Sequence, residues 1–141
     1  MFQSAAHRGA PESGERVFQV RIHGRGGQGV VSAAEMLAMA AFSEGRHAQA
    51  FPSFGSERTG APVVAFCRIA DAEIRVREPV ASPDALIVQD ATLLHQVDVF
   101  SGVPPSAYVL INATRSRKPF SHEACTTFSS PWRDEAGSLT E

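Results

Sequence analysis

The sequence of 141 residues predicts a layered α/β/α domain built on a mixed sheet. Residues 17–22 alternate apolar and polar side chains as a strand does, and the apolar, Ala-rich residues 30–42 are typical of a buried helix. Further short apolar runs at 63–69, 85–88 and 108–111 are separated by polar segments, as the strands of such a domain are.

Composition limits the class of protein. Hydrophobic residues make up 43% and charged residues 20%, which is typical of a folded domain with a core. The formal net charge of −2 and the lack of a basic run argue against nucleic-acid binding. No apolar stretch reaches about 20 residues, and residues 1–15 do not resemble a secretory signal. We therefore expect a cytoplasmic protein without a membrane span, in which Cys67 is a small buried residue.

After the first helix, Gly45 is expected to end the helical turn, and residues 47–51 predict a short second strand. Residues 52–62 contain two prolines and two glycines, which predicts a loop. This loop is long for so small a domain, and long loops of this kind are often functional.

The second half begins with residues 63–69, which we expect to form an antiparallel hairpin with residues 74–76. Residues 92–100 predict a helix with Asp90 as its cap, and residues 108–111 predict a last buried strand.

Domain boundaries follow from where this pattern starts and stops. Residues 1–15 are expected to be a flexible extension, residues 16–114 the folded domain, and residues 115–141 an irregular tail. No period of 2 or 3.6 continues through the tail.

The glycine-rich segment between the first strand and the first helix is the clearest candidate site. Gly24, Gly26 and Gly29 satisfy the pattern G-x-G-x-x-G, and a loop that opens a helix binds anions through backbone N–H groups and the helix dipole. The acidic residue that a dinucleotide site needs about 20 positions further on is missing at the end of the second strand. Three interpretations remain open: a dinucleotide site, a tight turn without a ligand, or contact with another ligand or partner.

Two long stretches of the sequence are distinctive. The first is His23-Gly24-Arg25-Gly26-Gly27-Gln28-Gly29-Val30-Val31 followed by Ala33-Ala34, and the second runs from Gln49 to Val63. Together they resemble the gamma subunit of 2-oxoacid:ferredoxin oxidoreductases, of which pyruvate:ferredoxin oxidoreductase is the best-known member. Shorter stretches follow in the order expected of the family: Pro83-Asp84, Asp90–Leu94 and Leu110–Asn112. The resemblance covers about Val17 to Asn112.

The resemblance implies one subunit of a thiamine-dependent enzyme, not active alone. The reaction implied is oxidative decarboxylation of pyruvate or a related 2-oxoacid with coenzyme A, which gives an acyl-CoA, carbon dioxide and reduced ferredoxin. Alpha, beta and ferredoxin-like subunits are expected to hold thiamine diphosphate, magnesium and iron–sulfur clusters, while this chain binds no cofactor by itself. It is expected to help form the coenzyme A region and the subunit interface.

Nine residues are candidates for ligand or interface contacts: Arg25, Gly26, Gly27, Gln28, Gly29, Ser53, Phe54, Glu57 and Arg58. The glycines would present backbone N–H groups, Arg25 a phosphate contact and Gln28 its amide, and the others would line the site. The competing interpretations are turn geometry for the glycines, a solvated side chain for Arg25, a simple cap for Gln28, and a solvated ion pair for Glu57 and Arg58. We nominate no catalytic residue and no metal ligand.

Two departures from the family pattern bear on function. Thr59 stands where the family more often has a second arginine, and residues 120–141 do not resemble the helices with which family members continue. We therefore expect a truncated or altered C-terminal end, apolar surface left exposed, and poor solubility of the isolated chain. A dinucleotide-binding oxidoreductase domain and an inactive interaction module are the alternative functions.

Overall fold

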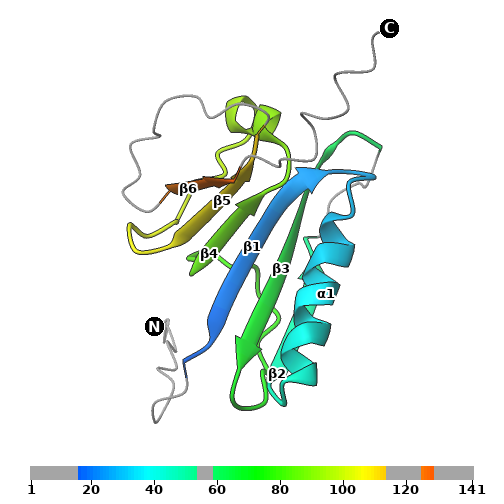
Figure 1. Ribbon diagram of the computed structural model, residues 1–141, viewed down its shortest axis with the longest axis vertical. Coiled ribbons are helices and arrows are strands. Elements are labelled where there is room, and N and C mark those ends of the chain that lie inside the picture. The colour runs from blue at the N-terminus through cyan, green and yellow to red at the C-terminus, as the bar shows by residue number, and fades with distance from the viewer. Residues whose placement is uncertain (1–15, 54–58, 114–124, 129–141) are drawn as a thin grey trace, which may run out of the picture.

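The computed structural model describes residues 16–53, 59–113 and 125–128 (Figure 1). The predicted N-terminal extension and most of the predicted tail lie outside these ranges. The elements are β1 (Phe18–Arg25), α1 (Val30–Ser43), β2 (His47–Pro52), β3 (Pro62–Ala70), β4 (Ala85–Val88), the 3₁₀ helix η1 (Ala91–His95), β5 (Tyr108–Asn112) and β6 (Cys125–Phe128). Neither helix among these residues has the length and apolar character needed to cross a membrane.

The described strands form one mixed sheet in the order β2-β3-β1-β4-β5-β6. β3 is antiparallel to both β2 and β1, whereas β1, β4, β5 and β6 are parallel to one another. The predicted α/β class and mixed sheet are confirmed. The chain leaves β1 toward β2 on one side and later returns to β4 on the other, so β1 and β4 flank the point where the strand order reverses.

The predicted hairpin between residues 63–69 and 74–76 is wrong. β3 pairs instead with β2, across the long loop between them, and with β1. Residues 73–77 form no strand, and the Val76 carbonyl accepts a hydrogen bond from the Arg68 guanidinium at 2.9 Å. Sequence spacing favoured the short turn, but contact between Phe51 and Phe66, with ring centroids 5.3 Å apart, favours the longer connection.

α1 packs over β1, β3 and β2 and forms one half of the core. Its Val30 and Ala34 meet Ile22 and Cys67 in a cluster that excludes solvent. The helix ends as predicted, with Gly45 in the left-handed region at φ 79°. Cys67 is fully buried, and burial raises the pKa of its thiol to about 11.

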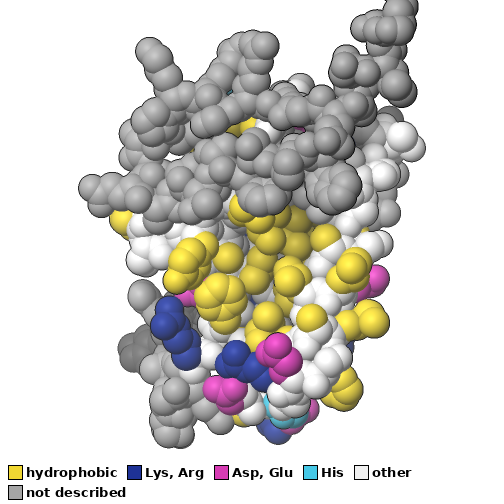
Figure 2. Space-filling view, viewed as in Figure 1, with side chains coloured by type: hydrophobic (Ala, Val, Ile, Leu, Met, Phe, Trp, Pro, Cys, Tyr) yellow, Lys and Arg dark blue, Asp and Glu magenta, His cyan; other side chains and the backbone are white. Residues whose placement is uncertain are grey.

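The prediction of a buried helix is wrong for the outer side of α1. Met36, Met39 and Phe42 are 68%, 67% and 77% exposed. An apolar sequence predicts burial against something, but it does not reveal whether the cover belongs to the same chain. A second exposed apolar side chain lies on the α1 side of the sheet. This is Leu110, which is 39% exposed beside its register partner Ile87. Figure 2 shows the hydrophobic side chains that gather across the middle of this face.

The opposite face of the sheet carries the second half of the core. β4 alternates, so that Ala85 and Ile87 pack on the α1 side while Leu86 and Val88 join Leu93 of η1 in a second cluster. The helix predicted over residues 92–100 is only η1 followed by turns, and Val99 of these turns is buried in the second cluster.

Two buried arginines hold irregular segments against this second face. Arg21 donates from Nη2 to the carbonyls of Val99 and Ser101, at 2.8 and 2.7 Å. Arg68 donates to the carbonyls of Val76 and Glu78, at 2.9 and 2.6 Å. Guanidinium groups thus satisfy backbone carbonyls that a helix would have satisfied internally.

Candidate functional site

The glycine-rich loop lies where the carboxyl end of β1 meets the amino end of α1. A Cβ atom at Gly24 would overlap Cγ2 of Val30 and lie 2.9 Å from Oε1 of Gln89, so only glycine fits between strand and helix. Gly29 precedes α1 in the left-handed region, with φ 74°. Turn geometry, which is one of the three interpretations, therefore accounts for part of the motif.

The backbone donors of the loop divide into occupied and free groups. Gly26 N–H donates to the Ala61 carbonyl at 2.8 Å, and Gln28 N–H donates to the Arg25 carbonyl at 3.0 Å. Gly27 and Gly29 N–H have no partner among the described residues. Of the three glycines expected to present donors, Gly26 therefore already uses its N–H group in a hydrogen bond within the chain.

The amino end of α1 adds further donors. The helix has no side-chain cap and no acidic residue in its first turn, and its first carbonyl acceptor is Gly29, which bonds Ala33 N–H at 2.8 Å. The N–H groups that precede Ala33 in the helix thus lack intrahelical acceptors, and the helix dipole places partial positive charge there. The arrangement favours an anion.

A pocket of about 390 Å³ opens at this point. Its lining consists of the glycine loop, the first turn of α1 and the end of the second loop: Arg25, Gly26, Gly27, Gly29, Val30, Val31, Ser32, Thr59 and Val63. The described end of the second loop meets the glycine loop, because Gly60 N–H donates to the Gly26 carbonyl at 3.1 Å. Thr59 lies in the wall of the pocket.

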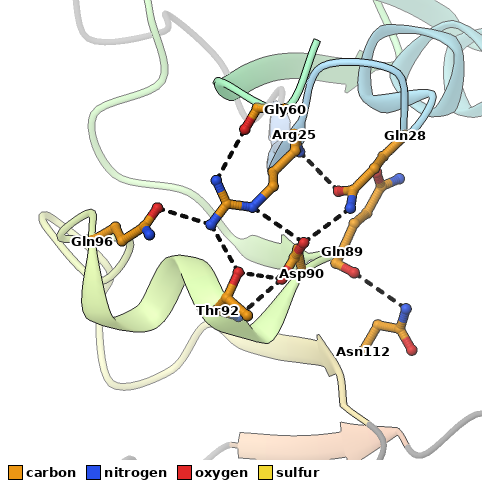
Figure 3. A network of polar contacts seen from close by, with 8 residues as sticks. All are labelled: Arg25, Gln28, Gly60, Gln89, Asp90, Thr92, Gln96 and Asn112. Atoms are coloured by element: carbon orange, nitrogen blue, oxygen red, sulfur yellow. Dashed lines mark hydrogen bonds and ion pairs between the residues drawn. The ribbon is translucent and has the colours of Figure 1, made fainter.

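The Arg25 side chain belongs to a polar network beside the pocket (Figure 3). Its Nε lies 3.3 Å from Oδ2 of Asp90, and its Nη1 donates to the Gly60 carbonyl at 3.0 Å. Its Nη2 donates to Thr92 Oγ1 and Gln96 Oε1, each at 2.8 Å. Four of the five N–H groups of the guanidinium therefore have partners within this chain.

Gln28 is committed to the same network. Its Oε1 accepts from Arg25 N–H at 2.8 Å, and its Nε2 donates to Asp90 Oδ2 at 2.9 Å. Both ends of the amide that was expected to meet a cofactor or partner are thus in use within the chain.

Sequence reasoning identified Asp90 only as a helix cap, which is confirmed by its 2.9 Å contact with Thr92 N–H. Asp90 also lines a second pocket of about 220 Å³, together with Gln28, Gln89 and Asn112. These side chains follow β1, β4 and β5 at the carboxyl edge of the parallel strands, the usual position of ligand sites in such sheets. Polar residues directly after two buried strands were the signal that could have indicated them.

The remaining candidates divide by location. Ser53 is exposed after β2, and its N–H donates to the Val64 carbonyl at 2.8 Å. Phe54, Glu57 and Arg58 lie outside the described residues. The structure therefore brings together the five candidates of the glycine loop. It does not place the four second-loop candidates against them, because only Ser53 is among the described residues.

Two titratable groups near the loop, His23 and Asp90, have strongly shifted pKa values. His23 is buried, and desolvation together with Arg21 lowers its pKa to about 4, which keeps the ring neutral at pH 7. Hydrogen bonds from Thr92 and Gln28 lower the pKa of Asp90 to about 2, so its carboxylate stays ionised. In the part of the chain that the structure describes, no three His, Cys, Asp or Glu residues gather as metal ligands would.

Comparison with known proteins gives a consistent picture. Residues 19–139 match the family model described as pyruvate ferredoxin/flavodoxin oxidoreductase. The chain is 58% identical over 98 residues to pyruvate synthase subunit PorC of Methanosarcina barkeri, which covers 70% of this chain and 54% of that protein. It is 49% identical over 102 residues to the common subunit gamma of pyruvate/ketoisovalerate oxidoreductases of Thermococcus kodakarensis, with 72% and 55% covered.

A solved structure agrees with this. The crystal structure of pyruvate oxidoreductase subunit PORC from Thermotoga maritima is 42% identical and superimposes with a TM-score of 0.61, covering 71% of this chain and 52% of that one. The chain thus spans about half the length of the curated relatives it matches.

Proposed function

Because the chain belongs to the pyruvate ferredoxin/flavodoxin oxidoreductase family, we propose that it acts as a gamma-type subunit of a 2-oxoacid:ferredoxin oxidoreductase. The complex would decarboxylate pyruvate or a related 2-oxoacid oxidatively with coenzyme A, giving acyl-CoA, carbon dioxide and reduced ferredoxin. The observation that carries the proposal is the family match over residues 19–139. Residues 16–114 would form its working domain in the cytoplasm.

The glycine loop would supply one wall of the coenzyme A region. Coenzyme A carries phosphate groups, and the pocket offers the N–H groups of Gly27 and Gly29, which have no partner among the described residues, beside the amino end of α1. No acidic residue lines the described part of this pocket, so its field favours an anion. Ser53, Phe54, Glu57 and Arg58 would complete the wall or contact a neighbouring subunit.

The other subunits would provide the redox chemistry. Thiamine diphosphate, magnesium and iron–sulfur clusters would reside in alpha, beta and ferredoxin-like partners, and ferredoxin would accept the electrons. The exposed apolar residues Met36, Met39 and Phe42 support an assembly of this kind, since a contiguous apolar face on a folded domain usually marks a contact surface.

Co-expression with the alpha, beta and ferredoxin-like subunits tests the proposal. A tagged chain should co-purify with thiamine diphosphate and iron–sulfur clusters, and the complex should reduce ferredoxin in a pyruvate- and coenzyme A-dependent reaction that is lost when this chain is omitted. A well-folded chain that binds NAD(H) or FAD and no partner would instead support a dinucleotide-binding domain. A well-folded chain that does neither would favour the third alternative, a module without activity.

A further inference from the structure

One carboxylate joins three segments that are far apart in the sequence. Asp90 follows β4, Arg25 and Gln28 belong to the loop after β1, and Gly60 ends the loop before β3. Figure 3 shows Arg25 and Gln28 converging on Asp90 while Arg25 reaches across to Gly60. The three segments meet where β1 and β4 flank the reversal of strand order.

The Asp90 carboxylate is fully used by this chain. Its Oδ1 accepts from Thr92 N–H at 2.9 Å and from Thr92 Oγ1 at 2.6 Å. Its Oδ2 accepts from Gln28 Nε2 at 2.9 Å and lies 3.3 Å from Arg25 Nε. Both oxygens thus have two donors each, and the low pKa of Asp90 agrees with a carboxylate that these donors stabilise.

The contacts continue from Asp90 into the loop backbone. Gln28 binds Asp90 with one end of its amide and Arg25 N–H with the other, and Gln28 N–H returns to the Arg25 carbonyl at 3.0 Å. This closed set of contacts fixes the turn that contains Gly26 and Gly27. It therefore sets the direction of the Gly27 and Gly29 N–H groups that line the larger pocket.

We propose that Asp90 is a positioning residue that holds the glycine loop in its ligand-ready conformation through Arg25 and Gln28. In this arrangement Arg25 and Gln28 act on the loop rather than on a ligand, and the backbone N–H groups of Gly27 and Gly29 make the ligand contacts. The nature of that ligand, an anion such as coenzyme A, rests on the proposed function. The positioning itself rests on the geometry alone.

Asp90→Asn tests the positioning in the full chain, because it keeps the side-chain shape while replacing one carboxylate oxygen by a donor. Hydrogen exchange of the amides of residues 24–32 should accelerate by about tenfold, while exchange in β3 stays unchanged. Asp71→Asn is the matched control. Asp71 also pairs with an arginine, Arg46 at 2.9 Å, but its side chain is 69% exposed and lies near the other end of β1.

Unchanged exchange in the loop of Asp90→Asn, or equal acceleration in loop and β3, would overturn the positioning role. If Asp90→Asn does not fold, Thr92→Val takes its place, since it removes only the 2.6 Å hydroxyl contact and the acceptor for Arg25. Loop-specific acceleration in that variant supports the proposal, and its absence refutes it.

Titration with coenzyme A separates this inference from the proposed function. In the assembled complex, Asp90→Asn should weaken coenzyme A binding by about fivefold or more, and Asp71→Asn should not. If the wild-type complex does not bind coenzyme A, the proposed ligand is wrong, while the exchange measurement still decides whether Asp90 positions the loop. If coenzyme A binds equally to wild type and Asp90→Asn although exchange in the loop is faster, the loop is not the coenzyme A site; if neither the exchange nor the binding changes, the positioning role is wrong.

Discussion

Gly24→Ala should destabilise the domain by about 1–3 kcal/mol, because it forces a methyl group into a space that is already filled. The new Cβ would overlap Cγ2 of Val30, which is 3% exposed and fixed between α1 and the sheet. The second neighbour, Oε1 of Gln89 at 2.9 Å, belongs to a flexible side chain that is able to move. For a domain of about 100 residues the melting temperature should fall by roughly 5–20 °C, which circular dichroism measures.

Two further variants test this reasoning. Gly27→Ala has open space around its new Cβ, so only its φ of 87° is unfavourable, and it should cost about 1 kcal/mol. Adding Val30→Ala to Gly24→Ala should relieve the overlap, with a coupling free energy of at least about 1 kcal/mol between the two sites. A Gly24→Ala variant as stable as wild type, or a double variant without coupling, would refute the packing argument.

Three more outcomes are expected. Gly27→Val should weaken coenzyme A binding or subunit assembly while the variant stays folded, with only a modest fall in melting temperature. A variant that fails to fold would favour turn geometry. Hydrogen bonds from Thr92 and Gln28 lower the pKa of Asp90 from 3.8 to about 2, so its stabilising contribution is present above pH 4 and is lost as the pH falls toward 2. Urea unfolding should show a steeper loss of stability over that range in wild type than in Asp90→Asn. Replacing Met39 and Phe42 by glutamine should raise the solubility of the isolated chain and reduce co-purification with partner subunits, with little change in melting temperature; unchanged co-purification would exclude this face from the interface.

Local signals in the sequence were sufficient for the elements that precede and follow the glycine loop. Alternation predicted β1, composition predicted α1, and the positions of Gly45 and Asp90 predicted the end of one helix and the start of another. These features depend on neighbours within a few residues, so one sequence contains the information that fixes them.

Strand pairing depended on contacts that local patterns do not contain. A short turn predicted that residues 63–69 would pair with the residues that follow, but aromatic contact and the Arg68 guanidinium favour pairing with β2. The sequence likewise predicted burial for the whole of α1, because an apolar side chain such as Phe42 looks the same whether its cover lies within the chain or outside it.

The candidate site divides in the same way. Glycines at fixed spacing marked the loop, yet the partner that holds it, Asp90, lies 65 residues after Arg25. The sequence made Arg25 and Gln28 candidates for ligand contacts because both stand beside the glycines. Only the fold shows that Asp90, which follows β4, lies against both the Arg25 and the Gln28 side chains.

The placement of β1 has a consequence for how the chain reaches this fold. β1 pairs with β3, which begins at Pro62, and with β4, which begins at Ala85, so every ladder contact of the central strand closes a long loop. Chains dominated by such distant contacts fold slowly, whereas α1 and the β2–β3 hairpin form from nearer segments. During synthesis, one edge of β1 stays unpaired until β3, which ends at Ala70, has emerged, and the other stays unpaired until β4, which ends at Val88, has emerged; unpaired strand edges of this kind are prone to aggregation.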